Sequence, residues 1–496
     1  MFIKKIFPLF VPLFLCCCVA LPSVEKIENS DEVRITVLQM NDVYEIDPVN
    51  GGKEGGLARV ASLRDSLLRS NPDTLTVLAG DLFSPSALGT APYQDGRLNG
   101  KQIVAAMNAL GLDYITFGNH EFDLKKGPFY DRLKESEFTW ISSNCFAKNG
   151  KAFPGVAEDK IVDIKGVKVG IFAVTLTKKK TGYVTYKEPF AIAKKKVAEL
   201  RPKVDILIAL THLSKDDDIQ LASRFPEIDL IMGGHEHENM QLWRGKDFTP
   251  IFKADANART VYVHNLYYNK NAAKKLTITS KLQRITDALP DQPKTAEVVK
   301  KWREIGYAGF RRDGFQPEQV VATTDVELDG REASVRNFST KLTELIAQSL
   351  LTAADKAQLS MYNSGSVRID DILPAGDITE YDIIRILPFG GNVVTVTMQG
   401  TVLERALNLG KASKGEGGFL QTGNVSGGEE GVPWSIGGQQ LDQDAEYTVA
   451  ILDYLVKVGD DKLQFLVSNP QVPIIADNGD IRKALIAELK KTFSAQ

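Results

Sequence analysis

The sequence predicts a layered α/β fold, and two observations support this prediction. From Val33 to about Tyr268, short β-branched runs alternate with segments whose apolar residues recur at helical spacing. Strands that alternate with helices build sheets that carry helices on their outer faces. The chain also has 496 residues, which is longer than one ordinary domain. We therefore expect two or three domains.

The first predicted domain covers residues 33–282. The run Val33–Met40 is typical of a strand, and Leu57–Leu68 has the apolar spacing of a helix. Further strands are predicted, in chain order, at Thr74–Ala79, Leu112–Phe117, Phe138–Ser142, Val167–Val174, Val204–Leu210 and Ile228–Met232.

The strand rhythm stops at residues 283–318. There Asp291–Glu304 predicts a charged amphipathic helix with Pro293 near its start. We interpret this segment as a helical connector or hinge. A second α/β domain is predicted for residues 319–490, with a glycine-rich loop at Gly410–Gly431.

The N-terminus has the pattern of an export signal. A short basic region precedes the apolar stretch Ile6–Ala20, which is too short for a comfortable membrane span. Residues 1–20 are therefore predicted to be a signal peptide. Two alternatives stay open: cleavage after Cys18-Val-Ala20, or a relaxed bacterial lipobox at Leu15–Cys18. We expect an exported protein that is periplasmic, lipid-anchored or secreted, with membrane attachment only through an N-terminal lipid.

The charge balance argues against one class of partner. The formal net charge is −3, with 60 basic and 63 acidic side chains. Proteins that bind nucleic acid carry a clear excess of basic residues. We therefore expect no nucleic-acid partner.

Five polar clusters follow the predicted strands of the first domain. They are Asn41-Asp42-Val43-Tyr44, Gly80-Asp81, Gly118-Asn119-His120-Glu121, Thr211-His212 and Gly233-Gly234-His235-Glu236-His237. Open α/β sheets carry their chemistry at the carboxyl ends of strands, so we expect these clusters to meet. Carboxylates, an amide oxygen and imidazoles suit two divalent cations such as Zn²⁺, Mn²⁺ or Fe²⁺. On an extended chain, alternate histidines such as His235 and His237 would point the same way. His264 belongs to no cluster and is interpreted as structural.

Together these clusters resemble those of the calcineurin-like metallophosphatases, and specifically the two-domain 5′-nucleotidase group. The resemblance covers about residues 33–490. It implies that Asp81 bridges two metal ions. It assigns the remaining ligands to two sites: Asn119, His212 and His235 to one, and Asp42 and His237 to the other. It further implies that His120 is catalytic and that Asp123 orients it.

Tyr44 departs from this family pattern. The family usually has Asp-x-His after the first strand, and Tyr44 stands at the histidine position. Three interpretations follow. In the first the metal binds with one ligand fewer, in the second Tyr44 ligates as phenolate and favours Fe³⁺, and in the third this metal site is lost and the protein is mononuclear or inactive. We favour the first two, because every other ligand position is intact.

The second domain has the features of a substrate-binding domain. Arg368 offers a planar fork to phosphate or ribose oxygens, and Phe389 offers a face for stacking. By resemblance to the 5′-nucleotidase C-terminal domain, Asn363, Arg368, Phe389 and Arg336 are expected to bind substrate. Lys462 stands where the family has an aromatic residue that closes the base sandwich. Its presence predicts weaker base discrimination or a more anionic substrate.

The resemblance implies an exported, metal-dependent phosphoesterase of nucleotide catabolism. It would hydrolyse nucleoside 5′-phosphates to nucleoside and phosphate by in-line attack of a metal-bound hydroxide. Two alternatives stay open. One is a nucleotide-sugar or cyclic-nucleotide phosphodiesterase that uses the same site. The other is a non-catalytic surface binding protein on a degenerate phosphatase fold.

Overall fold

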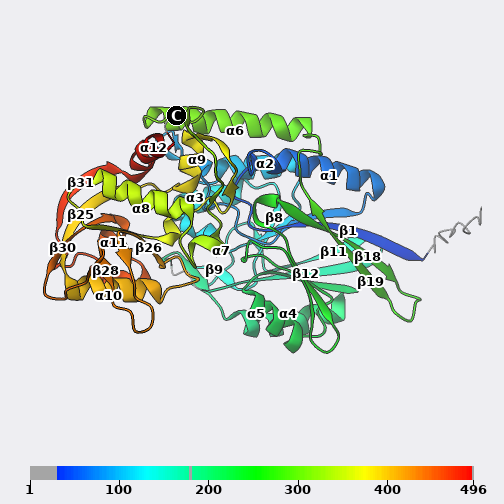
Figure 1. The fold of residues 1–496 in the computed structure, drawn as a ribbon. Coiled ribbons are helices and arrows are strands. Elements are labelled where there is room, and N and C mark those ends of the chain that lie inside the picture. Colours follow the sequence, from blue (N-terminus) through cyan, green and yellow to red (C-terminus); the bar gives the residue numbers. More distant parts are fainter. Residues whose placement is uncertain (1–30, 178–180, 494–496) are drawn as a thin grey trace, which may run out of the picture.

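The computed structural model describes residues 31–177 and 181–493, which form a mixed α/β protein (Figure 1). The predicted signal peptide, with its cleavage and lipidation alternatives, lies outside the described residues. Within the described part of the chain, no helix is long and apolar enough to cross a bilayer.

The first domain contains two large sheets that pack face to face. In spatial order, the seven strands of one sheet are β10 (Val156–Ala157), β8 (Thr139–Ile141), β7 (Tyr114–Thr116), β4 (Thr74–Leu78), β1 (Glu32–Met40), β18 (Thr260–Asn269) and β19 (Leu276–Arg284). The six strands of the other are β11 (Asp159–Ile164), β12 (Val167–Thr175), β14 (Ile206–His212), β15 (Leu230–Met232), β17 (Thr249–Lys253) and β16 (Met240–Arg244). An apolar core that includes Val37, Ile171 and Ile208 fills the space between the sheets.

Helices cover the outer faces of both sheets, as the sequence predicts (Figure 1). The seven-stranded sheet is covered by α1 (Leu57–Ser70), α2 (Lys101–Leu110), α3 (Lys126–Glu135) and α6 (Pro293–Arg312). The six-stranded sheet is covered by α4 (Pro189–Leu200) and α5 (Lys215–Arg224). Strands such as β14 are buried along their whole length, because they have a sheet on one side and helices on the other.

The helix α6 is longer than predicted and belongs to the helical layer of the first domain. It begins at Pro293, and the side chain of Gln292 accepts a hydrogen bond from the Thr295 amide, which is the expected chemistry of a helix start. The expected end was Glu304, but the helix continues to Arg312. It continues because Trp302, Phe310 and their neighbours pack on α1 and α2.

The second domain has a five-stranded sheet with helices on both faces. In spatial order its strands are β26 (Leu420–Gly423), β22 (Leu359–Asn363), β30 (Glu446–Leu452), β25 (Asn392–Gln399) and β31 (Ile474–Asp480). One face packs on α8 (Lys341–Ala353), α9 (Glu380–Ile386) and α12 (Ile481–Thr492), and the other on α10 (Gly400–Lys411) and α11 (Tyr454–Lys457). The short helix α7 (Glu332–Val335) lies between the two domains (Figure 1).

The prediction of one glycine-rich loop at Gly410–Gly431 is wrong in part. Residues 420–423 form β26, which pairs with β22 in the central sheet. Leu420 is buried there and explains the difference, because a strand that contributes to the core is held by its packing. Residues 412–419 remain without helix or strand.

Candidate metal centre

The five predicted clusters meet at the carboxyl ends of parallel strands. Asp42 follows β1, Asp81 follows β4 and Asn119 follows β7, and these three strands are neighbours with parallel pairing. In the facing sheet, His212 ends β14 and His235 follows the parallel strand β15. The two sheets therefore bring their strand ends, and the side chains after them, to one place.

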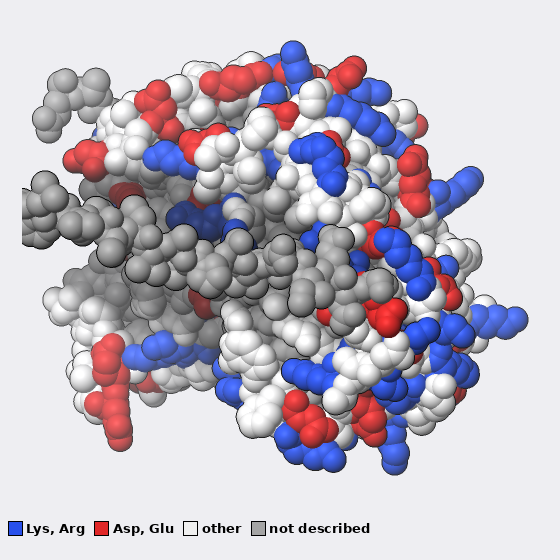
Figure 2. All heavy atoms as spheres, turned by 90° about the vertical axis from the view of Figure 1, so that its right-hand side faces the viewer, with Lys and Arg blue, Asp and Glu red and all other residues white. Residues whose placement is uncertain are grey.

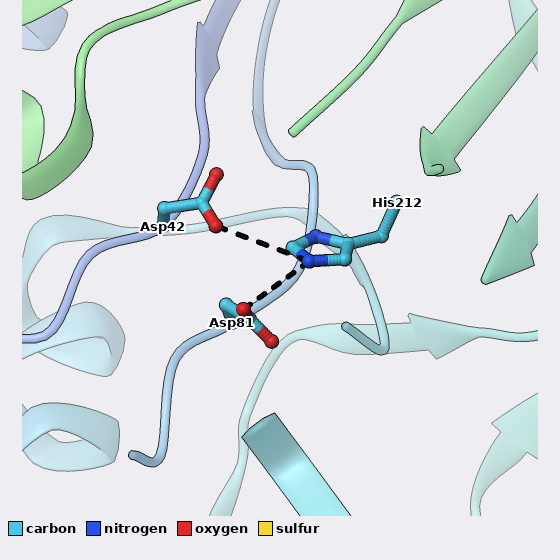
Figure 3. A group of neighbouring side chains, drawn as sticks. All are labelled: Asp42, Asp81 and His212. Carbon is cyan, nitrogen blue, oxygen red and sulfur yellow. Dashed lines mark ion pairs between the residues drawn. The ribbon is translucent and has the colours of Figure 1, made fainter. Parts of the chain in front are cut away.

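Asp42, Asp81 and His212 form the most compact part of this group. Each offers one ligand atom, and these atoms lie within 4.8 Å of one another in a fully buried position. Figure 3 shows the imidazole of His212 reaching between the two carboxylates. The distance from Nε2 is 3.2 Å to Asp81 Oδ2 and 3.9 Å to Asp42 Oδ1.

The hydrogen bonding of His212 fits a metal ligand. Its Nδ1 lies 2.8 Å from the carbonyl oxygen of Ala79, which can only accept, so Nδ1 carries the hydrogen and Nε2 the lone pair. In this tautomer the lone pair of Nε2 faces the negatively charged carboxylate of Asp81. Only a proton or a cation between them makes this contact favourable. Burial lowers the pKa of His212, but Asp81 and Asp42 outweigh it and raise the pKa to about 9. The site therefore attracts positive charge.

Two buried polar atoms support the same conclusion. His212 Nε2 and Asn119 Oδ1 are buried and have no hydrogen-bond partner among the described residues. Such atoms are rare in folded proteins. An imidazole nitrogen, an amide oxygen and a carboxylate are suitable ligands for Zn²⁺, Mn²⁺ or Fe²⁺, so these residues fit a divalent cation.

Unusual backbone conformations are concentrated at the centre. Asp42, Asp81, His235 and His237 have φ angles of 52°, 59°, 92° and 60°. These values are uncommon for residues with a side chain and often occur at functional sites. They also correct the expectation that His235 and His237 lie on an extended chain. Both line the cavity described below, because a left-handed loop after β15 turns them there.

Glu121 holds the loops that carry Asp81 and Asn119. Its buried carboxylate accepts hydrogen bonds from the amides of Asp81, Leu82, Phe83 and Gly118. The sequence pattern contained Glu121 but suggested no role for it. A Cβ atom on Gly118 would lie 2.1 Å from Asp81 Oδ1, so glycine is required where these loops meet.

His120 and Asp123 lie together beside this centre. His120 Nδ1 is 2.7 Å from Asp123 Oδ2, which also accepts a hydrogen bond from the hydroxyl of Ser84. The backbone amide of His120 donates to Asp81 Oδ1 over 2.8 Å. Asp123 thus contacts the imidazole ring, and the backbone of His120 is held against the carboxylate of Asp81.

The side chain of Tyr44 points into the part of the centre formed by Asp42, Asp81 and His237. Its hydroxyl oxygen lies 3.3 Å from Asp42 Oδ1, 3.1 Å from Asp81 Oδ2 and 3.0 Å from His237 Nε2. Burial, with Asp81 next in importance, raises the pKa of the phenol well above its usual value. Tyr44 is therefore a neutral hydrogen-bonding group in this arrangement.

The second domain reaches the centre through Asp370. Its Oδ2 lies 2.8 Å from His237 Nδ1, and its Oδ1 accepts a hydrogen bond from the amide of Glu332. Burial lowers the pKa of His237, but Asp370 outweighs it and raises the pKa to about 10. Sequence reasoning missed Asp370, because nothing in its local sequence indicates a partner 133 residues earlier.

A cavity of about 1040 Å³ opens between the two domains. Asp81, Asn119 and His120 line it from the first domain. From the second domain it is lined by Arg331, Arg336, Arg368 and the loop residues 415–417. An anionic group bound to the first domain would thus face several arginines.

The four expected substrate residues have different positions. Arg336 and Arg368 line the cavity, and Arg368 Nε is buried without a hydrogen-bond partner among the described residues. Phe389 is half exposed, with the Arg368 guanidinium carbon 5.8 Å from its ring centre. Asn363 is buried and accepts a hydrogen bond from the hydroxyl of Ser366, so it shapes the loop of its own domain.

Lys462 is bound to the glycine-rich loop. Its Nζ donates to the carbonyl oxygen of Ala412 over 3.0 Å and lies 3.5 Å from Glu416 Oε2. The nearby Phe465 packs against the guanidinium of Arg405.

Two further sequence predictions concern residues outside the centre. His264 is fully buried, with Gln39 Oε1 2.9 Å from one ring nitrogen and Ser280 Oγ 2.7 Å from the other. The prediction of a structural histidine is confirmed. On the face shown in Figure 2, Lys and Arg side chains are interspersed with Asp and Glu. This mixture agrees with the small net charge.

Comparison with known proteins gives matches over both domains. Residues 35–239 match the family described as calcineurin-like phosphoesterase, and residues 320–467 match the 5′-nucleotidase C-terminal domain. A 5′-nucleotidase of Vibrio cholerae is 26% identical, over 92% of this chain and 91% of its own length.

Two other matches differ in coverage. A trifunctional nucleotide phosphoesterase of Bacillus subtilis is 26% identical over 79% of this chain, but the chain spans only 28% of that protein. The solved structure of a 5′-nucleotidase precursor from Thermus thermophilus has a TM-score of 0.76 and 23% identity, over 93% of this chain and 97% of that one. This structural likeness shows a shared two-domain fold.

Proposed function

Because the chain belongs to the calcineurin-like phosphoesterases with a 5′-nucleotidase C-terminal domain, a family of hydrolytic enzymes, we propose that it hydrolyses nucleoside 5′-phosphates to nucleoside and phosphate. One observation carries the proposal. The cluster that fits a divalent cation opens into the same cavity as Arg336 and Arg368 of the second domain. A phosphomonoester could therefore meet the cation at one end and the arginines at the other.

The residues of the first domain would perform the chemistry. Asp81, Asn119, His212 and His235 would hold the cation, which when bound polarises the phosphoryl group and activates water. His120 would support the leaving oxygen. Asp123, 2.7 Å from His120 Nδ1, would fix the orientation and tautomer of that ring.

The residues of the second domain would bind the nucleoside. Arg368 has a buried Nε without a partner among the described residues, and a phosphate or ribose oxygen would satisfy it. Phe389 is half exposed and could stack on one face of a base. Stacking on a single aromatic face contributes about 1–3 kcal/mol, so we propose weak discrimination between bases.

We further propose that the protein acts after export. The pattern of residues 1–20 supports this, since a basic start and a short apolar stretch are typical of a signal peptide.

The test is phosphate release from AMP by the purified mature chain, first stripped of metal and then supplied with Zn²⁺ or Mn²⁺. We expect activity in the wild type and none in Asp81→Asn. The matched control is Asp131→Asn on the exposed side of α3, which should retain activity. Release of a nucleoside monophosphate from a nucleotide sugar, without phosphate from AMP, would favour the phosphodiesterase instead. Binding of AMP without turnover under any cation would favour the non-catalytic binding protein.

A further inference from the structure

We propose that the hydroxyl of Tyr44 takes the place of one of the two expected cations, so that the centre binds a single divalent cation per chain. The inference rests on the proposed function, because it concerns the metal content of the same site. It revises the expectation of two ions.

The Tyr44 hydroxyl lies among three expected ligand atoms. Asp42 Oδ1, Asp81 Oδ2 and His237 Nε2 surround the Tyr44 oxygen at 3.0–3.3 Å. These are the atoms that would hold a cation on this side. The phenol oxygen therefore lies where these three atoms converge, which is the place that a cation bound to them would take. One position cannot contain both.

The polar atoms on the two sides of the centre differ in their hydrogen bonding. On the Tyr44 side, the ligand atoms of Asp42, Asp81 and His237 all lie within 3.3 Å of the phenol oxygen, which has one proton to donate among them. On the other side, Asn119 Oδ1 is buried without a hydrogen-bond partner among the described residues, and His212 Nε2 faces the carboxylates of Asp81 and Asp42 without donating a hydrogen bond to either. Buried polar atoms are normally satisfied, so the unsatisfied pair marks where the cation is needed.

The second oxygen of Asp42 is also satisfied by the protein. Asp42 Oδ2 accepts hydrogen bonds from Asn41 Nδ2 and from the amide of His235, both over 2.8 Å. With Tyr44 at Oδ1, the carboxylate has hydrogen-bonding neighbours at both oxygens. Protein groups therefore lie at both oxygens of this buried carboxylate.

The surrounding structure holds the side chain of Tyr44 in this position. Tyr44 is 4% exposed, and its amide donates to Asn257 Oδ1 over 3.0 Å. Its ring contacts His237, at 5.5 Å between ring centres. Asp370 holds the far side of that imidazole from the second domain. The phenol and His237 thus support one another in a closed, buried arrangement.

The experiment counts metal ions. The full mature chain is stripped with a chelator, loaded with excess Mn²⁺, desalted and analysed for manganese per chain. The Mn²⁺ resonance spectrum then distinguishes isolated ions from an exchange-coupled pair. We expect about one ion per wild-type chain and the spectrum of an isolated ion. Tyr44→His should bind about twice as much manganese and give a coupled spectrum.

One control and one further variant complete the test. Tyr267→His adds a histidine on β18, away from the centre, and should bind as much manganese as the wild type. Tyr44→Phe removes only the hydroxyl and leaves the ligand atoms of Asp42, Asp81 and His237, so its manganese content should rise above one ion per chain. The wild-type count remains decisive if Tyr44→His does not fold.

Three outcomes separate the possibilities. Two tightly bound ions in the wild type would overturn this inference and leave the proposed phosphoesterase intact. A tyrosinate-to-iron absorption band after loading with Fe³⁺ would also overturn it, because Tyr44 would then be a ligand. One ion per chain without hydrolysis of any phosphoester would support the inference and refute the proposed function.

Discussion

Replacement of Glu121 tests how the centre is held together. Its carboxylate accepts from the amides of Asp81 at 3.0 Å, Phe83 at 3.2 Å, and Leu82 and Gly118 at 2.5 Å each. Those amides belong to the loops after β4 and β7, which carry Asp81 and the Asn119 cluster. In Glu121→Ala, all four amides lose their acceptor in a buried place.

The magnitude follows from the number of amides. A buried N–H without an acceptor costs about 1–3 kcal/mol, so the gross cost is at least about 4 kcal/mol. Part of this cost is offset, because the wild-type protein must bury the negative charge of Glu121. Burial, followed by repulsion from Asp81, raises the pKa of Glu121 for the same reason. We expect the opening of each affected amide to become about 10- to 100-fold easier.

Amide hydrogen exchange of the metal-free protein measures this effect directly. Exchange of residues 81–83 and 118 should accelerate in Glu121→Ala and less in Glu121→Gln, which keeps one acceptor oxygen. Glu137→Ala, at an exposed position, is the matched control. Unchanged protection of these amides in Glu121→Ala would refute the assigned role.

Three other predictions concern groups around the centre and in the core. Asp123→Asn should lower kcat about 10- to 100-fold with little change in KM, because His120 loses its charged partner; equal kcat values would contradict the proposed role. Asp370→Asn should accelerate hydrogen exchange in the loop of His237, since the interdomain bond loses its charge; an unchanged rate would show that the bond is unimportant. Burial lowers the pKa of His264 to about 3, so the unfolded chain binds the proton more tightly and stability is lost as pH falls from about 6.5 toward 3. At about pH 5 this loss is about 2 kcal/mol, and the melting temperature should fall more in wild type than in His264→Gln between pH 7 and pH 5; equal shifts would refute it.

The sequence alone determined which polar clusters are candidate ligands and that they lie at strand ends. Asp42, Asp81, Asn119 and His212 could be placed at strand ends, because strand patterns are short-range and parallel strands end at the same edge of a sheet. The layered fold and the buried role of His264 followed in the same way.

Only the tertiary structure showed which polar atoms of these residues contact one another and which are buried without a hydrogen-bond partner among the described residues. The sequence placed Tyr44 in the cluster but left open whether its oxygen is a ligand or fills a ligand position. The left-handed turns at His235 and His237 were also hidden, because they depend on the two sheets meeting. Asp370 reaches His237 only through the packing of one domain on the other. These contacts join residues far apart in the chain, so local pattern carries no information about them.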